Sequence, residues 1–100
     1  MFRHVVMFRW KQEVEAEALT QPLEELRRLP EHIDALRGFT VGSDAGVNDG
    51  NFDVVVVADF DDRDGYLAYR DHPEHVRVAR EHLGPLIGER AAVQHEIQGG

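Results

Sequence analysis

The segment NFDVVVVADF, at residues 51–60, contains the longest uninterrupted apolar run of the chain, Val54–Ala58. β-Branched residues favour strands, and consecutive side chains of a strand point to opposite faces of its sheet. A strand that is apolar on both faces is expected where both faces of the sheet are covered. The run therefore predicts a strand in a sheet that is buried on both sides.

Three further segments complete the predicted sheet. The sequence LRGFTVGSD, at residues 36–44, is separated from the valine run by the turn residues AGVNDG, which predicts a β-hairpin. At the N-terminus apolar and mixed positions alternate, and one parity groups Phe2, His4, Val6, Phe8 and Trp10. His4 is therefore expected on the apolar face. The segment AAVQHEI, at residues 91–97, predicts the last strand.

Helical patterns lie on both sides of the hairpin. Steps of three and four residues predict one buried helical stripe, formed by Leu19, Leu23, Leu26, Leu29 and Ile33. Either the regular helix begins near Thr20 with Pro22 in its first turn, or a longer helix is kinked at that proline. Pro30 is expected to end it.

After the valine run, Asp61 or Asp62 can cap a short helix that reaches about His72. Pro73 can open another helix, which Gly84 closes. The resulting order is strand, helix, strand, strand, helix, helix, strand. This order predicts an α+β domain with helices packed on one face of an antiparallel sheet. The predicted core positions are Phe2, Val6, Phe8, Leu26, Phe39, Val54, Val56, Leu67, Val76, Ala79 and Leu83.

Composition excludes several classes of protein. The 100 residues suit a single domain, and the chain has no cysteine for disulfides or thiolate metal sites. No apolar run reaches the ~18 residues of a membrane span, and the N-terminus lacks a signal peptide, so we expect a cytoplasmic protein with no membrane partner. The net charge of −8 disfavours contact with a phosphate backbone, so no nucleic-acid partner is expected.

Histidines are concentrated in YRDHPEHVRVAREHL, at residues 69–83. A shared metal needs imidazole nitrogens at about 2.0–2.1 Å, whereas His75 and His82 are two helical turns apart, roughly 10.5 Å along the axis. His72 precedes Pro73 and is expected at a helix cap. The chain has no HExxH motif, so we predict neither a metal site nor a cofactor.

His75 and His4 are the candidate functional histidines. His75 borders the stripe predicted for the last helix, which comprises Val76, Ala79, Leu83 and Leu86. If the helices cover the apolar face of the sheet, His75 and His4 can meet in one pocket, with Tyr69 beside them or in the core. Imidazoles under apolar walls have shifted pKa values that suit acid–base chemistry near neutral pH. The structural alternative is that both are satisfied buried polar residues.

The chain resembles the stress-responsive A/B barrel, or Dabb, family over nearly its whole length, residues 1–100. The segments that carry the resemblance are RHVVMFRWK, LRGFTVG, FDVVVVADF, YRDHPEH and the terminal β segment. Its most specific motifs are His4-Val-Val and Tyr69-x-x-His72-Pro73-x-His75. The resemblance implies a ferredoxin-like α+β sandwich with an antiparallel four-stranded sheet. It also implies a dimeric α+β barrel, in which two such sheets associate face to face.

A homodimer is also expected from the sheet itself. With helices on one face only, the other face would expose Val5, Met7, Val55 and Val57. A patch of this kind is one that a small monomer avoids, and a two-fold pairing is the simplest way to close it.

One branch of the family is the plant olivetolic acid cyclase, which closes a linear polyketide by an aldol reaction without a cofactor. The resemblance implies that His75 is the base and that His4 and Tyr69 line the site. The cyclase has an acidic residue in its last strand, whereas this chain reads Gln94-His95-Glu96 there. Further binding residues are expected at His72, Val6, Phe8, Val76 and Ala79.

Three functions follow from these patterns. The first is a small dimeric barrel protein with a pocket for a hydrophobic or carbonyl ligand. The second is a cofactor-independent, cyclase-like enzyme with His75 as its general base. The third is a structural or stress-stabilising protein without a ligand. The first two require a cavity of about 300 Å³ or more beside His75, whereas the third fills that space with side chains.

Overall fold

The structure, a computed structural model, describes residues 1–98. Its strands are β1 (Phe2–Trp10), β2 (Gly38–Ser43), β3 (Val54–Phe60) and β4 (Ile87–Glu96). Its α-helices are α1 (Thr20–Arg27), α2 (Arg63–Asp71) and α3 (Pro73–Arg77). Short 3₁₀ turns occupy Ala16–Leu19 and Leu29–Glu31, and a π-helical turn continues α3 over Val78–Leu83.

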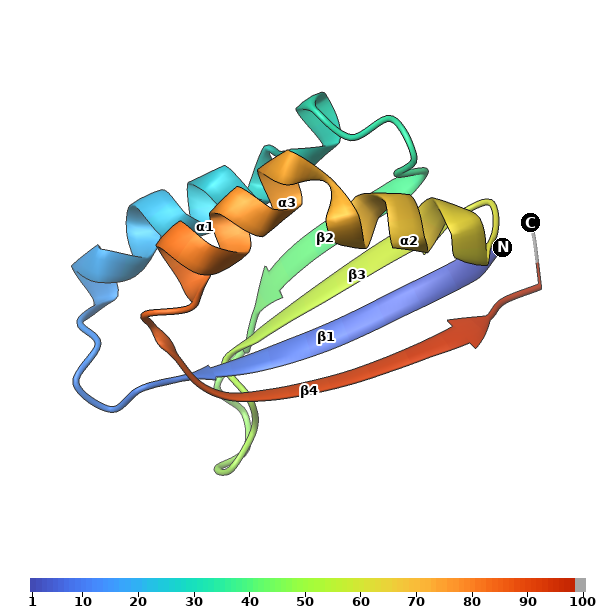
Figure 1. The fold of residues 1–100 in the computed structure, drawn as a ribbon. Helices are drawn as coiled ribbons and strands as arrows, with labels where there is room; N and C mark the ends of the chain where they lie inside the picture. Colours follow the sequence, from blue (N-terminus) through green and yellow to red (C-terminus); the bar gives the residue numbers. More distant parts are fainter. Residues whose placement is uncertain (99–100) are drawn as a thin grey trace.

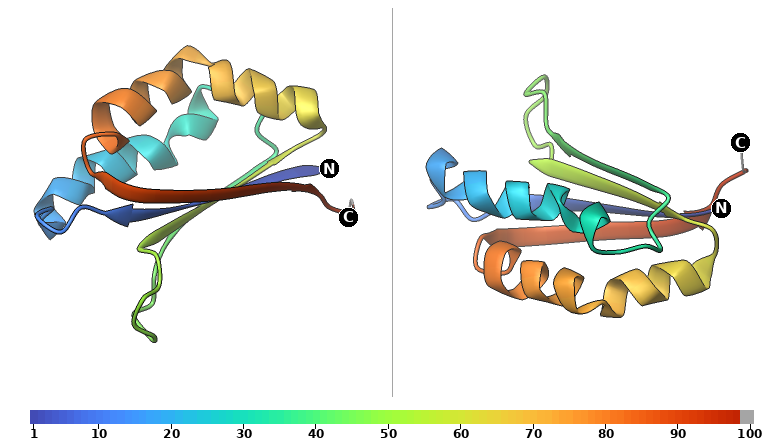
Figure 2. Two further views of the ribbon diagram at one scale, coloured as in Figure 1. Left: turned by 60° about the horizontal axis from the view of Figure 1, so that its bottom comes forward. Right: turned by 90° about the horizontal axis from the view of Figure 1, so that it is seen from above.

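The four strands form one antiparallel sheet in the order β2-β3-β1-β4. Cross-strand partners include His4 with Ala58 and Val6 with Val56, so the face predicted for His4 also carries the inward side chains of β3. The helices lie on this face only, and they run side by side above the sheet (Figures 1 and 2). This arrangement confirms the predicted ferredoxin-like α+β fold.

The helix-facing side of the sheet forms the hydrophobic core. Phe60, Leu29, Ile33, Val56 and Val78 are its largest fully buried side chains. His4 belongs to the same layer with only 4% of its surface exposed. The predicted core positions Phe2, Val6, Phe8, Leu26, Val54, Val56 and Leu83 are buried as expected, and Phe39 and Ala79 are half-buried.

The expected core is wrong at Leu67, Val76 and Ala79, which are only half-buried and do not pack against the buried cluster. The half-buried Phe39 does pack against it. On the last helix the buried side chains are Val78 and Leu83, which are five residues apart. In a π-helix each N–H bonds to the carbonyl five residues back, and the Gly84 N–H donates to the Ala79 carbonyl at 2.7 Å in this way. The predicted stripe assumed the α-helical period, so it selected Val76 in place of Val78.

The corner between α2 and α3 is built from the predicted caps. The Asp62 carboxylate accepts a hydrogen bond from the Gly65 N–H at 2.9 Å and caps α2. The His72 Nδ1 accepts from the Glu74 N–H at 3.1 Å and caps α3. His72 has extended backbone angles, as expected before Pro73. The chain therefore turns at His72, which lets α2 and α3 approach the sheet from different angles.

Pro22 lies in the first turn of α1, which begins at Thr20, so the first of the two alternatives for this helix is confirmed. The buried side chains of α1 are Pro22 and Leu26. An ion pair of 3.1 Å between Arg77 and Glu25 links α3 to α1. The helical segments thus form one layer over the sheet, the helical roof.

The second face of the sheet carries no helix (Figure 1). Val5, Val55 and Val57 are half-buried there, while Met7 is 36% and Val93 is 62% exposed. The β2–β3 loop extends below this face (Figure 2). Within residues 1–98, none of the helices has both the length and the apolar character that crossing a bilayer requires.

Candidate functional site

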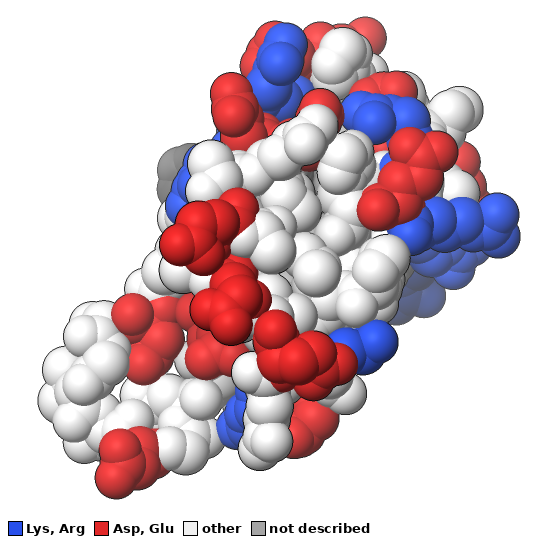
Figure 3. Space-filling model, turned by 90° about the vertical axis from the view of Figure 1, so that its left-hand side faces the viewer, with Lys and Arg blue, Asp and Glu red and all other residues white. Residues whose placement is uncertain are grey.

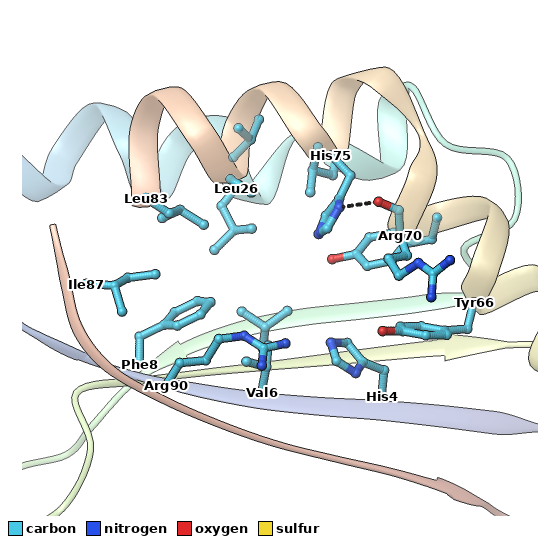
Figure 4. A pocket seen from close by; sticks show the side chains of 15 residues that line it. His4, Val6, Phe8, Leu26, Tyr66, Arg70, His75, Leu83, Ile87 and Arg90 are labelled. Carbon is cyan, nitrogen blue, oxygen red and sulfur yellow. Dashed lines mark hydrogen bonds between the residues drawn. The ribbon is translucent and has the colours of Figure 1, made fainter. Parts of the chain in front are cut away.

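A cavity of about 340 Å³ lies between the sheet and the helical roof. Figure 4 shows strands below it and α2, α3 and the π-helical turn above it. The apolar part of its lining consists of Val6, Phe8, Leu26, Leu29, Val56, Val78, Ala79, Leu83 and Ile87. The polar part consists of His4, Tyr66, Tyr69, Arg70, His75 and Arg90. The cavity thus has apolar walls with a small number of polar groups, as ligand sites commonly have.

His4 stands on the floor of the cavity as a neutral imidazole. Burial lowers its pKa to about 4, and the charges of Arg90 and His75 act in the same direction. The Gln94 side-chain amide, which lies opposite on β4, donates to the His4 Nδ1 at 2.8 Å. Because a neutral imidazole carries one proton, the His4 proton is on Nε2. His4 therefore offers an N–H donor.

His75 projects from α3 into the cavity and has the opposite hydrogen-bonding role, that of an acceptor. Its Nδ1 lies 3.0 Å from the Arg70 carbonyl oxygen, so the Nδ1–H donates to that oxygen. Burial is the main cause of its lowered pKa, which keeps the ring neutral at pH 7. The remaining nitrogen, Nε2, therefore keeps its lone pair. Figure 4 shows the ring directed from α3 down into the cavity.

A tyrosine ring lies close to each of the two histidine rings. Tyr69 is 2% exposed, and its ring centroid lies 4.4 Å from that of His75. The Tyr66 ring lies 4.9 Å from the His4 ring. Burial raises the pKa of the Tyr69 hydroxyl, so the phenol stays protonated and can donate a hydrogen bond. The polar end of the cavity thus combines two donors, at His4 and Tyr69, with one acceptor at His75.

Arg90 is a lining residue that the sequence analysis missed. It lies on β4 opposite Phe8, and its side chain reaches over Val6 toward His4 (Figure 4). The predicted last strand began at residue 91, whereas β4 begins at Ile87. A two-residue alternation extended back from Gln94 would have placed Arg90 on the same face.

The structure gathers most of the predicted site residues. His4, Val6, Phe8, Tyr69, His75 and Ala79 all line the cavity. His72 caps α3, and Val76 lies outside the lining because the π-helical turn directs Val78 inward. Tyr66 was also missed, although it lies one helical turn before Arg70 on the same helix. The aromatic spacing Tyr66-x-x-Tyr69 was the available signal.

The potential metal-ligating side chains of the described residues are dispersed. Within residues 1–98, no three histidine, aspartate or glutamate side chains lie close enough together to hold an ion. The two cavity histidines occupy opposite walls, and each has one nitrogen in a hydrogen bond with protein. What the arrangement can do chemically is to hold a polar group between donors and an imidazole acceptor.

Comparison with known proteins agrees with this architecture. The model of a family described as "Stress Responsive A/B Barrel Domain" matches residues 2–97. A stress-response A/B barrel domain-containing protein of Arabidopsis thaliana is 30% identical over an alignment of 81 residues, which covers 78% of this chain and 70% of the relative.

Solved structures are similar over almost the whole chain. A dimeric ferredoxin-like protein of unknown function from Thermobifida fusca is 38% identical, with a TM-score of 0.87 over 96% of this chain and 90% of the other. A dimeric protein of unknown function and ferredoxin-like fold from Bacteroides fragilis is 27% identical, with a TM-score of 0.81 over 96% of this chain and 95% of the other.

Proposed function

Since this chain belongs to the stress responsive A/B barrel domain family, we propose that it is a homodimer that binds a small, mainly apolar carbonyl ligand beside His4 and His75. The cavity of about 340 Å³ carries this proposal. Its volume falls in the range of about 300–1,000 Å³ that small-molecule sites occupy. A structural protein would be expected to fill such a space with side chains, because interiors are close-packed.

The polar groups suit a carbonyl oxygen. The His4 Nε2–H and the Tyr69 hydroxyl are donors, and a carbonyl oxygen accepts two hydrogen bonds. The rest of the ligand would contact apolar walls such as Leu26, Leu83 and Ile87. Their contribution to binding is about 25 cal/mol for each Å² of apolar surface buried. The ligand class is therefore a compact hydrophobic body with one carbonyl at its histidine end.

A pocket-filling variant tests this function. Ala79→Met extends a side chain into the cavity from the helical roof and should abolish binding of carbonyl compounds in a thermal-shift screen. Ala68→Met, on the exposed side of α2, is the matched control and should bind as the parent protein does. Equal binding by both variants would place the ligand elsewhere and contradict the proposal.

The homodimer is proposed from the open face of the sheet. That face exposes Met7 and Val93, and a hollow of about 380 Å³ lies beside Met7 under the β2–β3 loop. The similar proteins from Thermobifida fusca and Bacteroides fragilis are described as dimeric. Pairing two open faces would bury both patches and fill the hollow with partner side chains. Light scattering at micromolar concentration should give twice the 11.4 kDa of one chain.

A second candidate function is cofactor-independent catalysis with His75 as general base. The hydrogen bond from its Nδ1–H to the Arg70 carbonyl favours it, because the lone pair of Nε2 is left to face the cavity. In this reaction Nε2 takes a proton from a carbon next to the ligand carbonyl, and the electron pair moves to the carbonyl oxygen as an enolate. The His4 N–H and the Tyr69 hydroxyl then donate to that oxygen.

The catalytic candidate is tested with His75→Ala on a folded dimer, once turnover of a carbonyl compound is found. General-base catalysis contributes typically 10²–10⁴-fold, so the loss should correspond to about 3–5 kcal/mol of barrier. His82→Ala, on the same helical segment but outside the cavity lining, is the control. Near-full activity of His75→Ala would return this histidine to a binding or structural role.

A further inference from the structure

The cavity lining contains an arginine without a counter-ion. Among the ion pairs of residues 1–98 none includes Arg90, whereas Arg70, the other arginine of the lining, pairs with Asp71 at 2.9 Å. The sheet offers Arg90 no carboxylate nearby. Its neighbours two positions away on β4 are Gly88 and Ala92, and Phe8 lies opposite on β1.

The charge of Arg90 acts at the polar end of the cavity. Figure 4 shows its side chain extended along the floor, over Val6 and toward His4. Burial is the main cause of the lowered pKa of His4 and of the raised pKa of Tyr69, and the positive charge of Arg90 lowers both. Because Arg90, His4 and Tyr69 line the same cavity, one ligand can contact all three.

We propose that the pocket selects organic monoanions, namely molecules with an apolar body and one carboxylate that binds between Arg90 and the His4 Nε2–H. This inference rests on the proposed use of the cavity as a ligand site, and it adds the charge of the ligand. Guanidinium donors form charge-assisted, often bidentate hydrogen bonds with carboxylates, and these are stronger than bonds between neutral groups. The apolar body extends toward Leu83 and Ile87.

The acidic surface does not oppose this selection. The net charge is −8, and Figure 3 shows acidic side chains spread over one end of the molecule. Exposed charges are screened beyond about 8 Å at physiological ionic strength, so distant surface carboxylates act weakly on a bound ligand, whereas Arg90, which is itself exposed, acts on it by direct contact. With Arg70 held by Asp71, only one guanidinium is free there among residues 1–98. A single carboxylate therefore fits better than a doubly charged phosphate.

A matched pair of probes tests the inference. 4-Phenylbutanoate and 4-phenylbutanamide have nearly the same shape and differ in charge. Isothermal titration should give the acid about tenfold higher affinity than the amide, equivalent to about 1.4 kcal/mol. Arg90→Gln should lower the affinity of the acid to that of the amide, and Arg90→Lys should retain part of the preference. Arg27→Gln removes an exposed charge outside the lining and should change nothing.

The outcomes separate the two proposals. Equal affinity for both probes, or a preference that persists in Arg90→Gln, would overturn the anion inference and leave the ligand site in place. Failure of both probes to bind at millimolar concentration would count against the ligand site itself, and the anion inference would fall with it. As a second readout, the bound acid should raise the pKa of His4 in an NMR titration, because an anion favours the imidazolium. The amide should not.

Discussion

The two faces of the sheet are built from the same strands and differ in what covers them. On the helix-facing side β1 contributes Phe2, His4, Val6 and Phe8, all of them buried. On the open side the same strand contributes Arg3, Val5, Met7 and Arg9, which are half-buried or exposed. One side thus encloses a cavity with polar groups, and the other is a largely apolar surface, flanked by charges, that is not covered by helices (Figure 1).

The difference separates the two proposed functions, ligand binding and dimer assembly, along one strand. Because successive side chains of a strand point to opposite faces, His4 points toward the helices while its neighbour Val5 points to the open face. Changes on the cavity side should alter binding and leave assembly intact, and changes on the open side should do the reverse.

A charge on the open face should dissociate the proposed dimer. Val55→Asp would place a carboxylate in the middle of the paired sheets without a partner, at a cost of several kcal/mol. The dimer dissociation constant should therefore rise at least about a hundredfold. Val47→Asp makes the same change at a position that is 80% exposed on the hairpin loop, and it should stay dimeric. Light scattering over a concentration series distinguishes the two, and a dimeric Val55→Asp would refute the interface.

The cavity side should make the protein sensitive to pH. The pKa of His4 is about 4 in the folded protein and 6.5 in an unfolded chain, so the unfolded state binds more protons between these values. Stability should be full above pH 6.5 and should fall by about 3 kcal/mol as the pH approaches 4. His75, whose pKa is also lowered, acts in the same direction.

Urea unfolding at pH 7 and pH 4.5 measures this dependence. His4→Leu should remove most of the difference, while His32→Gln, an exposed histidine outside the cavity, serves as the control. The lowered carboxyl pKa of Asp59 also costs stability in acid, but only below its ordinary value of 3.8, which is outside this window. An unchanged pH dependence in His4→Leu would show that His4 is not a buried neutral imidazole.

Adjacent valines of β3 allow the same substitution on both faces. Val56 is 1% exposed in the core, so Val56→Ala should lower the free energy of unfolding by about 2 kcal/mol at any protein concentration. Val57 is half-buried on the open face. The effect of Val57→Ala should depend on protein concentration, because it acts through the dimer. Concentration-independent effects at both positions would mean that the open face has no partner.

Local sequence signals predicted most of the fold. The alternation of β1 placed His4 inside, Asp62 was a predicted cap, and Pro73 opened α3 as expected. These features depend on residues within one turn or one strand of each other. The family resemblance added the topology, and the matched family and the described sheet agree with it.

The rest depends on contacts between distant segments. The register of β4 against β1 decides that Gln94 meets His4 and that Arg90 enters the cavity, and no local pattern encodes that pairing. The π-helical turn depends on packing of the roof, so the α-helical period misplaced Val76. The cavity itself is a volume left between three helices and a sheet, which no single segment specifies.

Neighbouring residues of β4 provide the finest comparison. Gln94 lies on the helix-facing side of the sheet and donates to the His4 Nδ1, while Val93 faces the open side and is 62% exposed. Gln94→Leu should lower the free energy of unfolding by about 1 kcal/mol, because the buried Nδ1 loses its donor. The His4 proton should then no longer be confined to Nε2, so the ring becomes a mixture of the Nε2–H and Nδ1–H tautomers. The ¹⁵N chemical shifts of the ring report this mixture. Val93→Leu should leave those shifts unchanged and strengthen the dimer slightly. A single Nε2–H tautomer in Gln94→Leu would mean that another group fixes the proton of His4, and the donor role assigned to this histidine would then no longer depend on β4.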